Sequence, residues 1–310
     1  MDNLKILNIY NKRKFISFAI ILVLLLGLIP PNLVKAEETD NIEEQLSEEL
    51  GLDPSNSNLN IEHKDNEFII NTEINLLDEN TSFPSQESTS FSEEIDNIGV
   101  SLVINLDTDT VMIQSKETNI NGDEEEKEYT LDLSSSTDNE VKGTIEDRDT
   151  GNTYNYNPNE VTASARAAIP AGVKIAQKVL DKLIKAGYAA ILAGSTYIVV
   201  DEFYKLKKTK SHYRAEIHND QLFIGGGISK SAAINRLKSG YDTWSTNSSG
   251  AKSVAQGASP VNTSTKSEVD KKGTGKVRHY HPLKSINTGE RLKAGKMKRS
   301  VHAFFGKAER

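Results

Sequence analysis

Histidine is the residue type best able to carry chemistry in this sequence, which contains six histidines and no cysteine. Without cysteine the chain has no disulfides, no thiolate nucleophile and no zinc site with sulfur ligands. Five histidines follow residue 210, and three of these stand in two short apolar segments, as His279, His281 and His302. Imidazoles titrate near neutral pH, so a group of them can supply both a base and an acid.

The spacing predicts that these three side chains meet in space. A strand over residues 277–281 would point His279 and His281 to the same face, because side chains alternate along a strand. A second strand over residues 300–305, paired with the first in the right register, would bring His302 beside them. The sequence therefore predicts a cluster of three imidazoles.

The chemistry predicted for this cluster is metal-independent cleavage of RNA. Attack by a 2′-hydroxyl needs a base, an acid, and a cation that stabilises the negative charge developing on the phosphate. We predict His279 or His281 as the base, His302 as the acid, and Arg278 or Lys298 as the cation. Further contacts with the substrate are predicted for Lys276, Tyr280, Lys284, Lys298 and Arg299. This interpretation requires no cofactor.

Two alternatives remain open from the residues alone. Three imidazoles can also hold zinc with one free coordination position, which would make the protein a metal-dependent nuclease. The carboxylates nearest in sequence are Asp270 and Glu290, and neither is evident as a partner for a metal-bound histidine. In the second alternative, the basic part is a non-enzymatic module that binds polyanions or disturbs membranes.

Charge is distributed unevenly along the chain, whose formal net charge is −7. Residues 37–160 carry 33 acidic and 5 basic side chains, net −28, whereas residues 161–310 carry 27 basic and 10 acidic ones, net +17. The basic part is suited to a polyanion, which we predict to be RNA, with DNA left open. The acidic part could fold back over the basic face and mask it.

The first third of the sequence predicts an exported protein. Residues 1–36 have a basic start, an apolar run and small residues before Ala36, which is typical of a signal peptide cleaved after Ala36 and hence of a secreted protein. Residues 37–60 are acidic and polar and are predicted to be a disordered leader. Short alternating runs predict an acidic, antiparallel β-rich module over residues 61–160.

The remaining sequence completes an α+β, multidomain architecture. Residues 161–204 are predicted to form a helical hairpin that connects the modules, because apolar residues recur there at helical spacing. Its uncharged stretch, residues 186–200, is short for a membrane span but allows transient membrane contact. Residues 205–310 form the predicted basic C-terminal domain, which begins with an exposed lysine-rich linker and contains a helix capped by Ser229.

Three segments of the basic domain resemble the C-terminal domains of Gram-positive polymorphic toxins. They are residues 229–244, residues 278–282 (Arg-His-Tyr-His-Pro) and residues 302–306 (His-Ala-Phe-Phe-Gly). The order of modules also resembles a family of secreted proteins of staphylococci and bacilli regarded as toxins. The basic insertion over residues 284–299 is longer than the loop expected in such domains.

The resemblance implies an exported antibacterial toxin whose nuclease tip acts in the cytoplasm of the target cell. It also implies a cognate immunity protein in the producing cell, for which we expect an acidic surface. The resemblance covers residues 211–310, whereas the rest of the chain shares only the order of its modules. The residue roles given above come from spacing and chemistry.

Overall fold

The predicted α+β class is confirmed by the computed structural model, which contains two seven-stranded sheets with helices packed on them. It describes residues 42–50, 59–75, 97–118, 123–136, 141–156, 169–270, 276–294 and 299–309. The predicted signal peptide over residues 1–36 lies outside these residues. Among the helices described, none has the length and apolar character needed to cross a membrane.

Part of the segment predicted as a disordered leader is a helix, α2 (Ile42–Leu50). Leu46 and Leu50 stand four residues apart on the same side of this helix, and both are buried. The prediction was therefore wrong for these residues, because the acidic composition concealed an apolar stripe at helical spacing.

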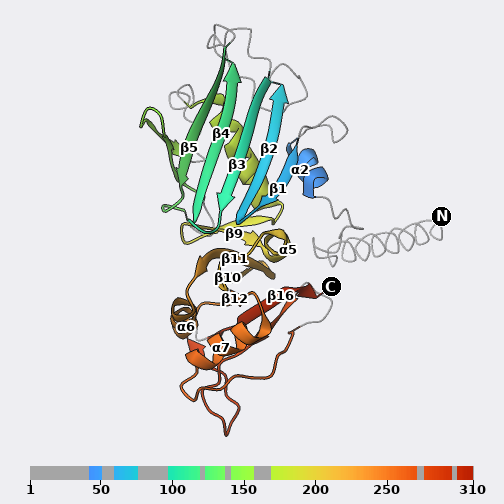
Figure 1. Ribbon diagram of the computed structural model, residues 1–310, viewed down its shortest axis with the longest axis vertical. Coiled ribbons are helices and arrows are strands. Elements are labelled where there is room, and N and C mark those ends of the chain that lie inside the picture. Colours follow the sequence, from blue (N-terminus) through green and yellow to red (C-terminus); the bar gives the residue numbers. More distant parts are fainter. Residues whose placement is uncertain are drawn as a thin grey trace, which may run out of the picture. The chain divides into compact units, whose positions relative to one another are not determined.

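The first sheet is an antiparallel meander in which every strand pairs with its neighbours in sequence (Figure 1). Its strands are β1 (Asn60–Lys64), β2 (Glu67–Asn75), β3 (Asn97–Asn105), β4 (Thr110–Thr118), β5 (Glu124–Asp132), β6 (Gly143–Asp147) and β7 (Thr153–Tyr156). The strands predicted within residues 61–160 are confirmed. Alternation explains them, since buried residues such as Phe68 and Ile70 alternate with more exposed ones along β2.

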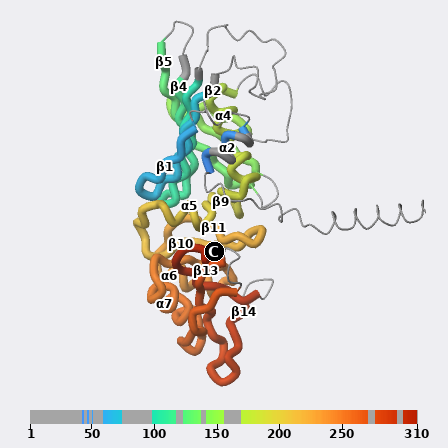
Figure 2. Tube along the Cα trace, turned by 90° about the vertical axis from the view of Figure 1, so that its right-hand side faces the viewer, coloured from blue at the N-terminus to red at the C-terminus, as the bar shows by residue number. Residues whose placement is uncertain are grey.

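One face of the first sheet is covered by helix α4 (Ala171–Lys185), which packs against β3 and β4 (Figure 2). Its buried stripe includes Val173, Ala176, Leu180 and Leu183, which the sequence pattern predicted, and its lysines lie on the other side. The predicted first helix of the connector is therefore confirmed.

The second half of the predicted helical hairpin is instead a β-hairpin, formed by β8 (Ala189–Leu192) and β9 (Ser195–Val199). Ala193 and Gly194 both have positive φ, at 50° and 75°, as a two-residue hairpin turn requires. The flanking residues are rich in β-branched and aromatic side chains, which favour strands. This correction removes the helix on which transient membrane contact was predicted.

The second sheet includes both strands of this hairpin, and its order is β13-β16-β12-β10-β11-β9-β8. Its other elements are α5 (Val200–Lys205), β10 (His212–His218), β11 (Gln221–Ile228), α6 (Lys230–Lys238), β12 (Thr243–Ser245), α7 (Ser248–Ala258), β13 (Lys276–Tyr280) and β16 (Ala303–Glu309). A separate small sheet pairs β14 (Lys293–Ala294) with β15 (Arg299–Ser300). All pairs in the second sheet are antiparallel except β12 with β16.

The core of the second sheet contains the only tryptophan of the sequence, Trp244, which is 1% exposed. Its ring packs edge-on against Phe203 and Tyr213, and its Nε1 donates a hydrogen bond to the carbonyl oxygen of Gly306 at 2.9 Å. Helix α7 packs against three strands of this sheet, β12, β13 and β16, and also against α6. The predicted cap of α6 is confirmed, since the Ser229 hydroxyl accepts the Ala232 N–H.

The lysine-rich segment predicted as an exposed linker is exposed at Lys205, Lys207 and Lys210, and it is also attached to the first sheet. Leu206 is buried, and the backbone N–H of Lys207 donates to the carbonyl oxygen of Asp65 at 2.8 Å. The ammonium of Lys208 bonds the carbonyl oxygen of Phe203 at 2.9 Å, and burial lowers the pKa of Lys208 to about 8. Hydrogen bonds therefore tie Lys207 to the turn between β1 and β2, and Lys208 to α5.

Candidate functional site

The histidine cluster forms where β13 and β16 lie side by side. The two strands are antiparallel, with His279 opposite Phe304 and with a bulge between residues 277 and 279. His281 directly follows β13, and His302 directly precedes β16. The three ring centroids are 4.6–4.8 Å apart, so the structure brings together the three histidines that the spacing predicted.

Each imidazole is oriented by a hydrogen bond at Nδ1. The partners are the carbonyl oxygen of Val277 for His279, at 3.0 Å, and that of Val301 for His281, at 2.8 Å. A carbonyl oxygen only accepts hydrogen bonds, so Nδ1 carries the proton in both rings and, in the neutral form, Nε2 keeps its lone pair. One nitrogen from each of the three rings lies within 4.8 Å of the other two.

Burial differs within the cluster. The side chains of His279 and His281 are 1% exposed, and that of His302 is 12% exposed. Burial lowers the pKa of His281 to about 3, with help from the nearby charges of His302, His279 and Arg291, and burial also lowers the pKa of His279. Both rings are therefore neutral at neutral pH, and only His302 faces solvent.

A fully buried carboxylate, Asp242, holds His302. Its Oδ1 lies 3.0 Å from the Nδ1 of His302 and accepts the backbone N–H of the same residue at 2.8 Å. Its Oδ2 accepts a hydrogen bond from Arg299 at 2.9 Å. Burial alone would raise the pKa of Asp242, but the hydrogen bonds and charges of His302 and Arg299 outweigh burial and lower it. Asp242 therefore stays ionised and fixes the His302 ring.

Asp242 is the residue that the sequence reasoning missed, because 60 residues separate it from His302. One signal was available. Asp242 precedes Thr243, Trp244 and Ser245, which form a strand whose three residues are all buried. An acid beside such a strand has to find a hydrogen-bonding or charged partner in the interior.

Two more carboxylates and a guanidinium border the cluster. Arg291 donates one hydrogen bond to Nε2 of His281 and another to Glu268, both at 2.9 Å. Asp270 places one oxygen 3.7 Å from Nε2 of His279 and the other 4.0 Å from Nε2 of His302. Paired backbone hydrogen bonds between Glu268 and His279 keep this acidic segment beside β13.

The predicted cation Arg278 is not placed at the cluster. It is exposed and forms an ion pair with Glu309 on the neighbouring strand. Lys298 lies outside the described residues. The guanidinium that contacts a histidine of the cluster is that of Arg291, which stands in the insertion noted in the sequence.

The predicted substrate-binding residues have varied surroundings. Tyr280 is buried in the core under α7, where its ring stacks on Phe305 and its hydroxyl hydrogen-bonds Ser248 at 2.8 Å, so its ring has no face free for a base. Arg299 is paired with Asp242 and acts on His302 through it. Lys284 forms a surface ion pair with Glu290 at 3.3 Å.

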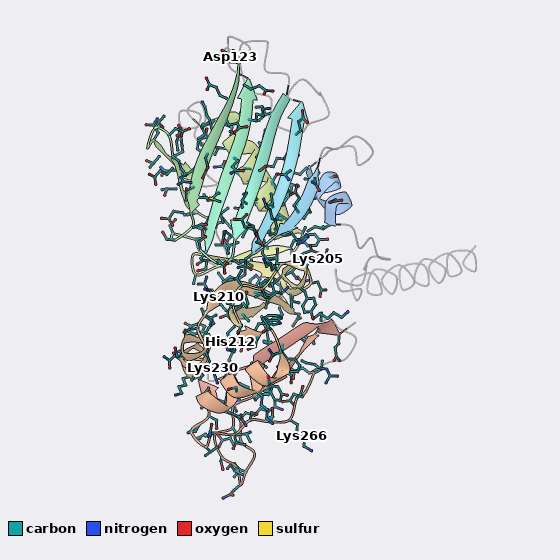
Figure 3. The ribbon with its side chains drawn as sticks, in the orientation of Figure 1. Asp123, Lys205, Lys210, His212, Lys230 and Lys266 are labelled. Carbon is teal, nitrogen blue, oxygen red and sulfur yellow. The ribbon has the colours of Figure 1, made fainter. Side chains whose placement is uncertain are left out.

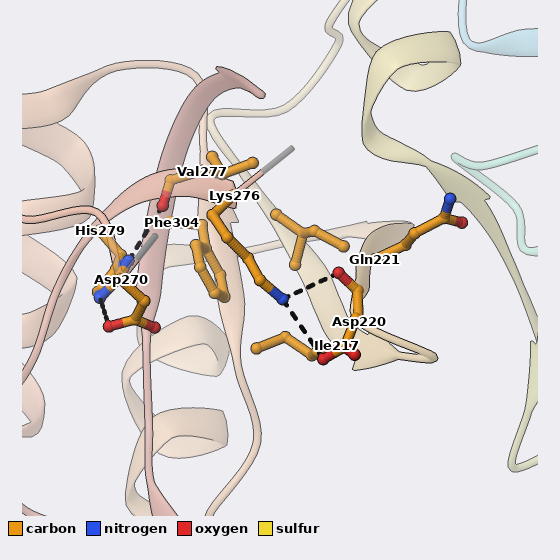
Figure 4. Close-up of a pocket in the computed structure, with 9 residues that line it drawn as sticks. Ile217, Asp220, Gln221, Asp270, Lys276, Val277, His279 and Phe304 are labelled. Carbon is orange, nitrogen blue, oxygen red and sulfur yellow. Dashed lines mark hydrogen bonds and ion pairs between the residues drawn. The ribbon is translucent and has the colours of Figure 1, made fainter. Parts of the chain in front are cut away.

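A shallow cleft of about 330 Å³, including its open mouth, adjoins the cluster (Figure 4). His279, Asp270 and Phe304 line one part of it, and Lys276 lines another. The ammonium of Lys276 is 2.9 Å from the carbonyl oxygen of Asp220 and 3.6 Å from the carboxylate of the same residue. Lys276 is therefore the predicted basic residue best placed to meet a ligand beside the histidines.

The other histidines have separate partners. His212, labelled in Figure 3, is buried at the start of β10, and its Nδ1 lies 2.9 Å from the hydroxyl of Ser245. His218 lies against the ring of Phe223, and His63 pairs with Glu202 at 3.0 Å. Within the described residues, the cluster of His279, His281 and His302 is the group of three whose donor atoms converge.

Comparisons of the whole chain with models of protein families, with curated proteins and with solved structures find no match. Converging imidazole nitrogens beside an arginine can exchange protons, bind an anion or ligate a metal ion.

Proposed function

We propose that this protein is an exported antibacterial toxin whose C-terminal part cleaves RNA at the histidine cluster. The observation that carries the proposal is the convergence of three imidazoles, with His302 fixed by the buried carboxylate of Asp242 and His281 contacted by Arg291. Such a group offers the base, the acid and the cation that cleavage of a phosphodiester requires.

The proposed reaction is attack by the 2′-hydroxyl of RNA on its own phosphodiester. Of the two predicted bases, His279 is the one whose Nε2 has no hydrogen-bond partner within the described structure and which lines the cleft, whereas Nε2 of His281 accepts from Arg291. His279 takes the proton of the 2′-hydroxyl, whose oxygen bonds to phosphorus. The bond from phosphorus to the 5′-oxygen breaks, and His302 gives that oxygen a proton. The products are a 2′,3′-cyclic phosphate and a free 5′-hydroxyl. Arg291, rather than the Arg278 predicted from the sequence, stabilises the negative charge that develops on the phosphate.

The charge of the C-terminal part supports a nucleic acid as the substrate. Residues 203–310 carry 22 basic and 7 acidic side chains, which attract a phosphate backbone without selecting a sequence. Lys276 lies in the cleft beside the cluster, where a phosphate next to the cleaved bond would come close to its ammonium. DNA lacks the 2′-hydroxyl, so the proposed reaction excludes it as a substrate.

The test uses the chain without the proposed signal peptide, residues 1–36. The C-terminal part is not tested alone, because β8 and β9 belong to the same sheet as β13 and a chain that starts at residue 205 would lack them. The protein is incubated with total RNA and with DNA, and products are resolved on gels. We expect cleavage of RNA alone, its loss in His302→Ala, and its retention in the control His218→Ala. Intact RNA with the parent protein, or equal cleavage by His302→Ala, would contradict the proposal.

Export and protection of the producing cell complete the proposal. We propose secretion directed by residues 1–36 with cleavage after Ala36, action in the target cytoplasm, and an acidic immunity protein that covers the basic surface. Secretion is tested by sequencing the N-terminus of the protein recovered from culture medium. A start at Glu37 supports it, and retention of residues 1–36 on the secreted chain contradicts it.

Masking of the basic surface by the acidic part is also proposed. Asp65 pairs with Lys207 at 3.1 Å, and Asp109 pairs with Arg214 at 2.7 Å. In the described part of the chain these pairs include no member of the histidine cluster. Masking would therefore reduce the attraction of RNA to the protein without closing the site.

A further inference from the structure

The orientation of the three imidazoles suits metal binding as well as proton transfer, because one nitrogen from each ring points to a common place. We propose that His279, His281 and His302 bind one divalent transition-metal ion of the zinc class, with Asp270 as the oxygen ligand. This metal site goes beyond the proposed function. A bound ion would occupy the imidazole nitrogens to which the proposed reaction assigns proton transfer, so metal binding and metal-independent cleavage are measured separately below.

The hydrogen bonds at Nδ1 are those that metal-bound histidines make. A histidine ligand usually donates its other ring N–H to a backbone carbonyl or a carboxylate, which fixes the ring and directs the free nitrogen at the metal. Val277 and Val301 supply carbonyl oxygens to His279 and His281, and Asp242 supplies a carboxylate to His302. All three rings therefore have an outer partner, and none of these partners comes from solvent.

A buried nitrogen without a partner points to a ligand. Nε2 of His279 is buried and has no hydrogen-bond partner within the described structure, although the side chain is only 1% exposed. Oε1 of Glu268, 3.3 Å from Nε2 of His281, also lacks a hydrogen-bond partner there. Buried polar atoms are nearly always satisfied, so these two call for a binding partner at this place.

The distances suit an ion after a small closure of the rings. The three donor nitrogens lie within 4.8 Å of one another. Tetrahedral zinc with Zn–N bonds of about 2.05 Å holds its nitrogen ligands about 3.4 Å apart, so each pair of donor nitrogens must approach by at most about 1.4 Å. Asp270 lies between His279 and His302, and its side chain is 50% exposed, which leaves it free to rotate onto the ion.

Arg291 competes with the ion for His281. Its guanidinium donates to the lone pair of Nε2 that a metal would use. The side chain is 39% exposed, so it can leave the cluster without disturbing the core. Departure of the guanidinium also frees the Glu268 carboxylate, whose negative charge would offset that of the cation.

The donor set selects the class of metal. Imidazole nitrogen suits zinc, copper, iron and nickel, whereas magnesium and calcium prefer oxygen ligands. Three histidines with water in the fourth position is a common arrangement for zinc with an exchangeable site, and Asp270 is placed to take that fourth position. His302 is the cluster member that reaches solvent, which gives the ion a route to the other two rings.

The test is zinc binding by the chain without residues 1–36, first freed of metal with a chelator. Calorimetry should show one zinc per chain, and cobalt should give the visible absorption of a four-coordinate nitrogen and oxygen site. We expect His279→Ala and His302→Ala each to weaken binding at least about 100-fold, with His218→Ala unchanged as the matched control. Circular dichroism without metal checks that the variants fold.

Asp270→Asn provides a variant at an accessible position, where failure to fold is not expected. It should weaken zinc binding about tenfold and shift the cobalt spectrum, because a carboxylate oxygen leaves the coordination sphere. Absence of stoichiometric zinc binding by the parent chain, or equal affinities in the parent and the two alanine variants, would overturn the proposal. RNA cleavage by a protein that binds no zinc would leave the proposed function standing alone, and zinc binding without RNA cleavage would leave only the metal site.

Discussion

The two sheets of this protein have seven strands each but differ in how the chain connects them. Every strand of the first sheet pairs with its sequence neighbours, so its contacts are local. In the second sheet β16 pairs with β12 and β13, and residues near positions 242, 280 and 302 come together. Non-local pairing, rather than strand number or strand length, therefore concentrates the titratable groups at one place in the second sheet.

The carboxylates buried in the two sheets show the same difference. Asp147 in the first sheet accepts backbone N–H groups from Asp149 and Thr150, two and three residues away, and so stabilises its own turn. Asp242 in the second sheet holds a distant histidine and a distant arginine. One carboxylate serves local structure, and the other orients a reactive group.

The largest effect expected from this comparison is on RNA cleavage. Asp242→Asn should lower kcat about 100-fold or more with KM little changed, because the amide no longer stabilises the required tautomer and charge of His302. Asp147→Asn should leave both constants unchanged. Steady-state kinetics on a fluorogenic RNA measure both variants. Equal losses in the two variants would break the distinction between a local and an orienting carboxylate.

The next effect concerns zinc. Arg291→Met should strengthen zinc binding about tenfold, since it removes both a competitor for His281 and a positive charge near the ion. Lys293→Met, two residues along the same segment and exposed, is the control and should change little. Calorimetric titration of the metal-free chain measures both. Weaker binding in Arg291→Met would show that the guanidinium supports the site instead of competing for it.

A contact that joins the first sheet to α5 should affect stability. Burial opposes the ionised form of Glu202, but hydrogen bonds from His63 and Lys205 outweigh burial and lower its pKa. Glu202→Gln should therefore cost about 1–2 kcal/mol of unfolding free energy near neutral pH. A lowered folded-state pKa gives stability above the unfolded-state pKa that is lost as pH falls through the folded-state value.

Denaturant unfolding between pH 7 and pH 3 measures this difference. The difference in unfolding free energy between the parent and Glu202→Gln should shrink as the pH falls below the ordinary pKa of a glutamate and through the lowered pKa of Glu202. A gap that stays constant over that interval would mean that the carboxylate charge of Glu202 contributes no stability.

The smallest effect is expected from the masking contacts. The triple variant Asp65→Asn, Asp107→Asn and Asp109→Asn removes acids that contact Lys207, Thr209 and Arg214. RNA binding at low salt should become a few-fold tighter, because nearby acids no longer repel the phosphates. Fluorescence anisotropy of labelled RNA measures this change, with all proteins carrying His302→Ala so that no cleavage is expected. Identical affinities at low salt would rule out masking by these acids.

Alternation and turn chemistry were sufficient to predict much of the fold. The strands of the first sheet, helix α4 and the Ser229-capped helix α6 follow from local patterns. The β-hairpin of β8 and β9 was misassigned as a helix, because a short apolar run has no clear period. The turn at Ala193 and Gly194 was the decisive local signal.

The site was predictable to the same degree. His279 lies on β13, His281 directly follows that strand and His302 directly precedes β16, so alternation along two neighbouring extended segments was enough to predict the imidazole cluster. Asp242 and Arg291 could not be found in this way, since their contacts depend on the parallel pairing of β12 with β16 and on the path of a long insertion. Tertiary contacts of that kind have no sequence period.

The position of β16 in the sheet has a consequence for the order of synthesis. It lies between β13 and β12, and it comes later in the chain than every strand with which it pairs. Until β16 has been synthesised, β12 and β13 each lack the strand that pairs with both of them, and His302, which directly precedes β16, is absent. The cluster of three histidines therefore forms only after residue 302 has been translated, and a product shortened before that residue would lack the cluster.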